Sequence, residues 1–433
     1  MQKKSGKSVI KKAILKYKSL PVQVKASLWF LICAFLQKGI GFITTPIFTR
    51  MMTTAEYGVY NVFVSWMGII EVFVTLKISS GSYIQGLVKF EDKRKEYSSS
   101  LLGLTTVLIA VWTVVYLLTA NFWNGLFKLN TAQMLLMMIL LLLNATMSFW
   151  ATQQRVDYKY VKLVIMTLIG SVLTAVLGII FVYQADDKAT ARILSTVVAD
   201  VIVYGVLFFS IIYKGKKIYH PEFWKYILRL NIPLIPHYLA GNILNTADRI
   251  MISDIVGESQ AGIYSLAYSV SLIMTVFNQA ITQTLEPWIY KRIKLKEFSR
   301  LGKAISPFLI CVAGLNVFLM LFAPEAIRIF APPEYYEAIY VVPPIAMGVF
   351  FQFMYTFFAP FEFYYEKTRY ITVATFVGAA VNVVLNMAFI RLFGYFAAGY
   401  TTLICYILFA VMHYLFMKRI CSTASQTPHS QRN

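Results

Sequence analysis

The sequence has few charged residues and few cysteines for its length. Only 14% of the 433 residues are Asp, Glu, Lys or Arg, whereas soluble domains carry about 25%. The hydrophobic fraction is 58%, and a soluble fold cannot bury that much apolar surface, which argues against a soluble enzyme. The four cysteines lie in apolar runs and in a basic tail, so we expect reduced thiols that pack as small hydrophobic residues.

Patterns for metal binding and catalysis are also missing. The four histidines are scattered and no pair has the spacing of metal ligands, so the sequence predicts neither a metal site nor an organic cofactor. We find no nucleotide-sugar motif, and we predict no catalytic residues. The first apolar run is too long for a cleavable signal peptide and indicates an uncleaved first membrane span.

Twelve apolar runs of about 20 residues dominate the chain, and runs of this length are typical of transmembrane helices. Their continuous apolar character does not fit the alternating pattern of a β-barrel. We therefore predict an all-α integral membrane protein with twelve transmembrane helices. The predicted spans are 26–49, 57–81, 97–120, 131–153, 161–183, 192–213, 228–254, 260–283, 301–323, 338–360, 369–391 and 395–417.

Acidic residues are scarce relative to basic ones, 20 against 40, which gives a net charge of +20. Thirty-one of the 40 basic residues lie in the two tails and in every second connection between spans, including the flanking ends of those spans. The positive-inside rule then places both termini in the cytoplasm. Most of the charge thus sets topology near anionic lipid headgroups, and no folded basic domain is present to bind nucleic acid.

The chain divides at its longest polar connection, and its two halves repeat. Glu56-Tyr-Gly58-Val-Tyr60 near the second span has a counterpart in Gln260-Ala-Gly262-Ile-Tyr264 near the eighth. Six spans per half predict two six-helix lobes related by a parallel pseudo-two-fold repeat, with the substrate path between them. The predicted parts are a basic N-terminal tail (1–25), an N-lobe (26–213), a cytoplasmic linker (214–227), a C-lobe (228–417) and a C-terminal tail (418–433).

Apart from those in the first or last three residues of a span, three basic residues lie inside predicted spans, where ionisable groups usually face a bundle interior or a wet cavity. They are Lys38, Lys77 and Arg249. Lys77 could instead extend to the interface, and Arg249 could pair with Asp248 or Asp254. Polar side chains at helical spacing predict that spans seven and eight line the same cavity, although such stripes also join helices to each other. The predicted lining residues are Asn242, Asn245, Tyr264, Tyr268 and Asn278.

Acids and prolines inside spans suggest coupling and gating. Glu71 and Asp200 are predicted to be buried, and a buried carboxylate can exchange a proton or hold a cation. A salt bridge with Lys38 or another cation is the alternative for Glu71. Three prolines are predicted to bend spans one and seven, either as gates or as static kinks. These are Pro46, Pro233 and Pro236.

Two groups of motifs resemble bacterial polysaccharide-biosynthesis flippases of the multidrug/oligosaccharidyl-lipid/polysaccharide transporter superfamily. The first is Gly39-x-Gly41-x-x-x-x-Pro46-x-x-x-Arg50, followed by Glu56-Tyr-Gly58-Val-Tyr60. The second is Leu230-Asn-Ile-Pro233-Leu-Ile-Pro236, then Asp248-Arg249, then Gly262-Ile-Tyr264-Ser-x-Ala267-Tyr268, then Pro287. The resemblance covers residues 24–418 and implies a fold like that of multidrug and toxin extrusion (MATE) transporters.

The resemblance also implies a function. Such flippases translocate undecaprenyl-diphosphate-linked oligosaccharides, such as O-antigen, capsule or exopolysaccharide units, to the outer leaflet of the bacterial cytoplasmic membrane. Lys38, Lys77 and Arg249 would hold the diphosphate. Coupling to H⁺ or Na⁺ is expected, with Glu71, Asp200 and Asp248 as candidates. A glycan polymerase and a chain-length regulator are expected partners.

Other functions remain open at this point. A multidrug or cation antiporter of the same superfamily would favour an acidic, aromatic cavity. A peptidoglycan-precursor flippase would be expected to have fourteen spans rather than twelve. A membrane glycan polymerase would need a larger external loop than the sequence offers.

Overall fold

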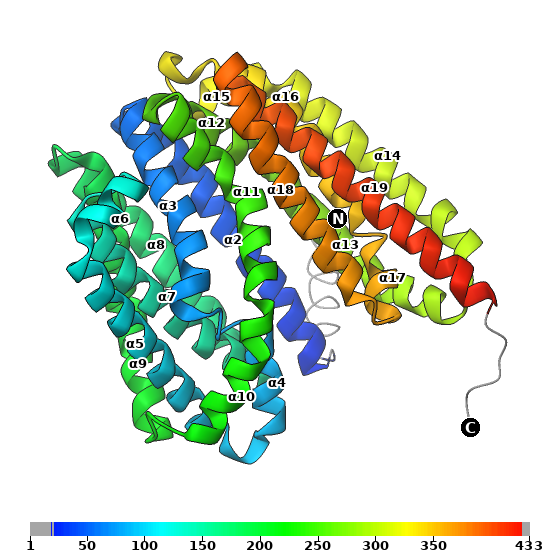
Figure 1. Ribbon diagram of the computed structural model, residues 1–433, viewed down its shortest axis with the longest axis horizontal. Helices are drawn as coiled ribbons and strands as arrows, with labels where there is room; N and C mark the ends of the chain where they lie inside the picture. Colours follow the sequence, from blue (N-terminus) through cyan, green and yellow to red (C-terminus); the bar gives the residue numbers. More distant parts are fainter. Residues whose placement is uncertain (1–18, 20, 427–433) are drawn as a thin grey trace, which may run out of the picture.

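The computed structural model describes residue 19 and residues 21–426, and this part of the chain folds into helices without any strand (Figure 1). Eleven of the helices described are long and apolar enough to cross a membrane. The chain is therefore a multi-pass membrane protein, as the apolar runs predict. The eleven crossings are formed by α2 (Val22–Met51), α3 (Thr54–Thr75), α5 (Arg94–Leu118), α7 (Thr131–Val156), α8 (Tyr160–Gln184), α9 (Lys188–Gly215), α12 (Glu258–Ser271) with α13 (Ile273–Lys294), α14 (Phe298–Leu321), α16 (Ala338–Tyr355) with α17 (Ala359–Tyr364), α18 (Thr368–Phe393) and α19 (Phe396–Gln426).

The remaining predicted span corresponds to α11 (Ile235–Ile255). Its 21 residues extend about 31 Å, enough for a hydrocarbon core of about 30 Å. Polar residues keep α11 out of the apolar set, but it packs between α3, α12 and α18. A helix with this many polar groups needs protein rather than lipid around it. The other helices described are α4 (Gly81–Lys89), α6 (Ala120–Phe127), α10 (Pro221–Asn231) and α15 (Ala323–Phe330), with short 3₁₀ turns at Glu91–Lys93, Ile232–Leu234 and Pro333–Tyr335.

Two of the membrane helices begin with a capping box that is visible in the sequence. At the start of α3, the backbone N–H of Thr53 donates to the Glu56 carboxylate at 2.7 Å, and the Glu56 N–H donates to the Thr53 hydroxyl at 3.2 Å. Asn130 and Gln133 form the same reciprocal pair at the start of α7. Such caps satisfy backbone donors that have no partner within the helix and fix where the helix begins.

Several predicted spans are interrupted in the structure. The predicted span 57–81 ends at Thr75, because Leu76 and Lys77 adopt the left-handed conformation. The predicted span 228–254 begins only at Ile235, since residues up to Asn231 belong to α10. Pro233 lies in the 3₁₀ turn between these helices and Pro236 in the first turn of α11, where a missing N–H is tolerated. By contrast, α2 continues without interruption through Pro46.

The helices form an N-terminal group, α2–α9, and a C-terminal group, α11–α19. In Figure 1, α5 to α9 lie on one side and α13 to α19 on the other, with α2, α3, α11 and α12 between them. The largest buried apolar cluster joins both groups, since Phe48 and Tyr57 pack with Ile252 and Tyr264. Two further clusters lie within the N-terminal group, and one of them takes in Phe223 of α10.

The two groups are in contact at the end of the molecule that carries α6 and α15. We call it the distal end; the opposite end, which carries the lysine- and arginine-rich connections, is the basic end. At the distal end, Thr49 donates to the carbonyl of Phe330 at 2.6 Å and Arg50 to that of Ile329 at 3.0 Å. Burial raises the pKa of Tyr335, so its phenol stays protonated and donates to the Thr53 carbonyl at 3.3 Å. The positive-inside rule predicts that the distal end faces the outside.

The repeated motifs meet at this distal contact. Gly58 of α3 and Gly262 of α12 pack against each other's helix. A methyl group on Gly58 would overlap the carbonyl oxygen of Glu258, and one on Gly262 would overlap that of Thr54. Small residues let two helix backbones approach closely, so the matched glycines set the distance between α3 and α12.

Candidate functional site

A cavity of about 640 Å³ lies between the two groups of helices. The N-terminal group contributes Lys38 of α2, and the C-terminal group contributes residues of α11, α12, α13 and α16. Of the described lining residues, one is basic, none is acidic, and most of the others are amides, hydroxyls and aromatic rings. They are Lys38, Asn245, Tyr268, Leu272, Thr275, Asn278, Gln279, Thr282, Gln352, Phe353, Tyr355 and Thr356.

Lys38 lies beside a break in the predicted eighth span. Its ammonium group donates to the hydroxyl of Thr275 at 3.1 Å. Helix α12 ends at Ser271 and α13 begins at Ile273. Leu272, which separates the two helices, lines the cavity. The Thr275 hydroxyl in turn donates to the Leu272 carbonyl at 2.6 Å. In this way the backbone break and the lysine are joined in one short hydrogen-bonded chain.

Arg249 lies next to the cavity but is not among the described residues that line it. Its guanidinium carbon is 4.2 Å from the ring centre of Tyr268, which does line the cavity. The Nε of Arg249 is buried and has no hydrogen-bond partner among the described residues. An arginine held on an aromatic face keeps its charge close to the cavity and has donors to offer.

Lys77 and Glu71, predicted separately as a substrate ligand and a coupling acid, bind each other. Their side chains form an ion pair at 2.5 Å, and both are about one quarter exposed. Neither lines the cavity. The structure therefore agrees with the alternative prediction for Glu71, a salt bridge to a cation, and that cation is Lys77.

Asp248 is buried in the C-terminal group and is surrounded by neutral hydrogen-bond donors. Its Oδ2 accepts from Tyr264 and from Thr402, each at 2.7 Å, and its Oδ1 accepts from Asn386 at 2.7 Å. These partners belong to α12, α19 and α18. Asp248 is only 2% exposed and forms no ion pair in the described part of the chain, including with the neighbouring Arg249.

The other predicted site residues have separate positions. Asn245 and Asn278 line the cavity, and Asn245 accepts a hydrogen bond from Tyr406 at 3.0 Å. Asn242 joins helices instead, because its amide donates to the Gly68 carbonyl of α3 at 2.9 Å. Asp200 is buried on α9 within the N-terminal group and does not line the cavity. The described residues contain no group of three or more His, Cys, Asp or Glu side chains that could hold a metal ion.

Sequence reasoning missed several partners of the predicted residues. Asn386 and Thr402 complete the surroundings of Asp248, and Gln352 and Tyr355 complete the cavity wall. Asn382 and Asn386 lie four residues apart in the predicted eleventh span. That polar i, i+4 pair on an apolar helix was the available signal.

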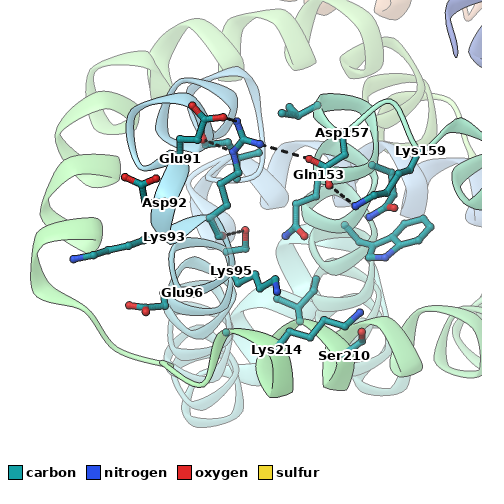
Figure 2. A pocket seen from close by; sticks show the side chains of 18 of the residues that line it. Glu91, Asp92, Lys93, Lys95, Glu96, Gln153, Asp157, Lys159, Ser210 and Lys214 are labelled. Atoms are coloured by element: carbon teal, nitrogen blue, oxygen red, sulfur yellow. Dashed lines mark hydrogen bonds and ion pairs between the residues drawn. The ribbon is translucent and has the colours of Figure 1, made fainter. Parts of the chain in front are cut away.

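A second cavity, of about 1050 Å³, lies at the basic end of the N-terminal group (Figure 2). Many of its charged residues are already paired: Asp157 with Lys159 at 2.7 Å, Arg94 with Glu91 at 2.8 Å, and Glu96 with Lys217 at 2.9 Å. Its described lining belongs entirely to α4–α9 and their connections, up to Lys217. It therefore does not lie between the two groups, and the central cavity is the stronger candidate.

The central cavity is chemically suited to a polar ligand that carries negative charge. Amide and hydroxyl groups can donate to and accept from the hydroxyls of a sugar. Aromatic rings offer flat apolar faces, and the Lys38 ammonium offers one cation for a phosphate. A ligand cation would find no carboxylate among the described lining residues.

Comparison with protein families gives two matches. The family described as polysaccharide biosynthesis protein matches residues 24–294 of this chain. A second family, MatE, matches residues 233–388.

Three relatives share between 22% and 25% of their residues with this chain. A protein of the Lsg locus of Haemophilus influenzae is 22% identical over 83% of this chain and 89% of its own length. The “Capsular polysaccharide biosynthesis protein CapF” of Staphylococcus aureus is 25% identical over 72% of this chain and 78% of its own length. The “Probable low-salt glycan biosynthesis flippase Agl15” of Haloferax volcanii is 22% identical over 43% of this chain and 41% of its own length.

Two solved structures share the fold. An inward-facing multidrug resistance MATE transporter of the MOP superfamily superposes with a TM-score of 0.73 at 15% identity, over 90% of this chain and 96% of that one. The lipid II flippase MurJ superposes with a TM-score of 0.68 at 16% identity, over 90% of this chain and 87% of that one. The all-helical fold predicted from the sequence is therefore that of the MATE-like transporters.

Proposed function

Because this chain belongs to the polysaccharide biosynthesis protein family, we propose that it is a flippase that moves lipid-linked oligosaccharides across the membrane. The glycan-related names of two relatives and the MATE-like fold agree with this function. A flippase catalyses no covalent step, so no catalytic residues are assigned.

The main support for the proposal is the composition of the central cavity. Its described lining offers many neutral hydrogen-bonding groups, two tyrosine rings and the single cation Lys38. A glycan attached to a diphosphate combines hydroxyl groups with negative charge, and this lining complements both. A charge-assisted hydrogen bond from Lys38 to phosphate contributes about 1.5–3 kcal/mol.

The substrate that we propose is an undecaprenyl-diphosphate-linked repeat unit of O-antigen, capsule or exopolysaccharide. It would pass from the cytoplasmic to the outer leaflet of a bacterial cytoplasmic membrane, with both protein termini in the cytoplasm. The glycan and diphosphate would cross in the cavity, while the prenyl chain stays among membrane lipids. A glycan polymerase and a chain-length regulator are proposed partners that act on the product.

Alternating access is the proposed mechanism, and the contacts at the distal end support it. The hydrogen bonds of Thr49 and Arg50 to the other group hold that end together. From Tyr268 the cavity continues towards the basic end as far as Thr282 in the middle of α13 and Thr356, which directly follows α16. This arrangement corresponds to a state that loads substrate from the cytoplasm.

Coupling to an H⁺ or Na⁺ gradient is part of the proposal, and Asp248 is the leading candidate of the three acids. Glu71 is already neutralised by Lys77. Asp248 has three neutral donors and no ion-pair partner among the described residues, so a proton or Na⁺ could neutralise it. Tyr264, Thr402 and Asn386 also carry oxygens, which are suitable Na⁺ ligands after reorientation of the side chains.

The second candidate is a multidrug or cation antiporter, which the MatE match over residues 233–388 favours. A cationic drug would be repelled by Lys38 and would find no described carboxylate in the cavity. A membrane glycan polymerase has less support, because the distal connections are short helices and turns. We therefore retain the flippase as the proposed function.

Deletion of the gene tests the proposed function directly. The lipid-linked repeat unit is expected to accumulate on the cytoplasmic leaflet, measured by protection from an impermeant glycan-oxidising reagent. Normal export of glycan together with altered drug tolerance would instead identify an antiporter.

Replacement of Lys38 tests the role of the cavity. Lys38→Met should weaken substrate binding by about 10- to 150-fold, the loss expected for one charge-assisted hydrogen bond. Lys303→Met removes an exposed lysine of α14 and serves as the matched control. Equal export by both variants, at equal amounts in the membrane, would remove Lys38 from the site.

A further inference from the structure

A buried acid and a buried histidine form a pair outside the central cavity. The Nδ1 atom of His413 on α19 lies 2.7 Å from Oε1 of Glu362 on α17. Both side chains are fully buried, with 0% exposure. Neither residue has a role in the proposed path of the glycan, so their retention inside a membrane helix bundle requires another explanation.

Each member of the pair has one polar atom left without a partner. In the described part of the chain, neither Nε2 of His413 nor Oε2 of Glu362 makes a hydrogen bond. Buried polar atoms are nearly always satisfied, so an exception calls for a reason. A purely structural pair is often no more stable than apolar residues of the same volume. The unused atoms instead leave room for a proton to be gained, lost or shared.

The charge of the pair depends on how many protons it holds. With one proton between the carboxylate and the imidazole, the pair is electrically neutral and can remain buried. Loss of that proton leaves one negative charge away from water, and gain of a second leaves one positive charge. Both charged forms are costly in a dry interior, so proton exchange requires water to reach the pair.

One aromatic residue connects the pair with the central cavity. The ring of Tyr355 lies 5.1 Å from the ring of His413, and Tyr355 also lines the cavity. Phe409 packs edge-on against the imidazole at 4.5 Å. A change in the position of Tyr355 would therefore open a route between the cavity water and Nε2 of His413.

The helices packed around the pair carry other ionisable groups. Helix α17 packs against α13, α18 and α19. Tyr290 of α13 faces Tyr364, and Tyr370 of α18 stacks on Phe416 of α19. The charged residues that follow α17, Glu366, Lys367 and Arg369, are exposed. Glu286 of α13 interacts electrostatically with Tyr290, and Cys421 of α19 with Tyr365. The tyrosines stay neutral over the range in which histidine titrates, so among the described residues Glu362 and His413 are the ionisable partners in direct contact.

We propose that Glu362 and His413 form a proton-binding site that must hold one proton before the protein can close around it. In the hydrated state, a hydronium ion would give its proton to the pair and leave as water. In the opposite state, the pair would return that proton to water. The inference rests on the proposed transport cycle and adds to it a proton carrier distinct from Asp248.

Infrared difference spectroscopy on the full-length protein in phosphatidylethanolamine–phosphatidylglycerol liposomes tests the proposal. Spectra are compared between about pH 5 and about pH 8, the range in which histidine titrates. The wild type should show a titrating carboxyl or imidazolium signal that is lost in both Glu362→Gln and His413→Gln. Glu366→Gln removes an exposed acid of the same segment and should keep the signal.

Export measured as a function of pH provides the second readout. The wild type should respond to pH, whereas Glu362→Gln should give a flat profile at an equal amount of inserted protein. Difference spectra identical to the wild type, or an unchanged pH profile, would overturn the proposal.

If both variants fail to insert, a variant that retains His413 as its only histidine is titrated instead. It replaces His220, His237 and His429 by Asn. An imidazole that does not titrate over this range would also overturn the proposal. The spectra need no glycan, so they remain decisive even if the deletion strain exports glycan normally and the proposed function fails.

Discussion

At the scale of single residues, Asp248 and Glu71 have different partners. Glu71 is balanced by a lysine at 2.5 Å, whereas the described hydrogen-bond partners of Asp248 are the neutral groups of Tyr264, Asn386 and Thr402. A carboxylate that is 2% exposed and lacks a cation costs free energy in the folded state. A proton or Na⁺ that binds Asp248 during the transport cycle would explain why this cost is tolerated.

Replacement of Asp248 by asparagine should separate stability from transport. Asp248→Asn removes the buried charge and keeps the shape, so we expect an equal or higher melting temperature in detergent. Export should become insensitive to the ion gradient and fall by about 5- to 150-fold, the usual range of a coupling free energy. Asp254→Asn is the matched control, because Asp254 lies on the same helix but is exposed and paired with Lys128. A lower melting temperature with unchanged ion dependence would make Asp248 structural.

Individual contacts were harder to predict from the sequence than the helices that carry them. Helical spacing predicted that Asn245, Tyr268 and Asn278 line one cavity, and the structure brings these three together with Lys38. The family resemblance implied that Lys77 binds substrate beside Lys38, but Lys77 follows the end of α3 in a left-handed conformation and pairs with Glu71. Helical spacing shows which side chains share a face, but it does not show where a helix ends or which partner competes for a charge.

At the scale of helices, α3 and α12 approach each other closely at the two repeated motifs. Gly58 and Gly262 occupy matching places in the two repeated motifs, and each leaves space for the backbone of the other helix. Hydroxyl groups of Thr54 and Ser259 are also in contact beside them. The two motifs therefore form a crossing between the two groups of helices.

A methyl group at this crossing should weaken the contact between the two groups. Gly58→Ala forces α3 and α12 apart, and overpacking of this kind costs about 1–3 kcal/mol. We expect a lower melting temperature and easier labelling of the distal end by an impermeant reagent. Gly41→Ala is the control, since nothing lies within 4 Å of the added methyl group and alanine favours the helix. Equal stability of both variants would contradict the role of this crossing.

Long apolar runs were sufficient to predict the membrane helices, because the bilayer fixes their length. The interruptions were less predictable. Prolines marked the break before α11, but the break between α12 and α13 falls at Leu272 without any proline or glycine. At this break the Thr275 hydroxyl donates to the Leu272 carbonyl three residues earlier and accepts from Lys38 of the other group. Lys38 and Thr275 are 237 positions apart, and no pattern within one segment predicts such a contact.

At the scale of the whole molecule, the contacts that close the distal end separate the cavity from that side of the protein. Contacts from α2 to α15 and from α3 to α12 hold the two groups together at that end. The cavity lies on the other side of these contacts, towards the basic end. For a substrate to leave on the distal side, these contacts must separate, which is the movement that alternating access requires.

A disulfide across the distal contact should therefore stop transport. Thr54→Cys and Ser259→Cys together place two thiols where the hydroxyl groups now touch. Under oxidation the double variant should export no more glycan than the deletion strain, and a reductant should restore export. Each single variant is the control for the native cysteines, of which Cys311 is exposed. Full export by the oxidised, cross-linked protein would show that the distal contact does not open during transport, because a covalent bond between α3 and α12 allows only local movement there.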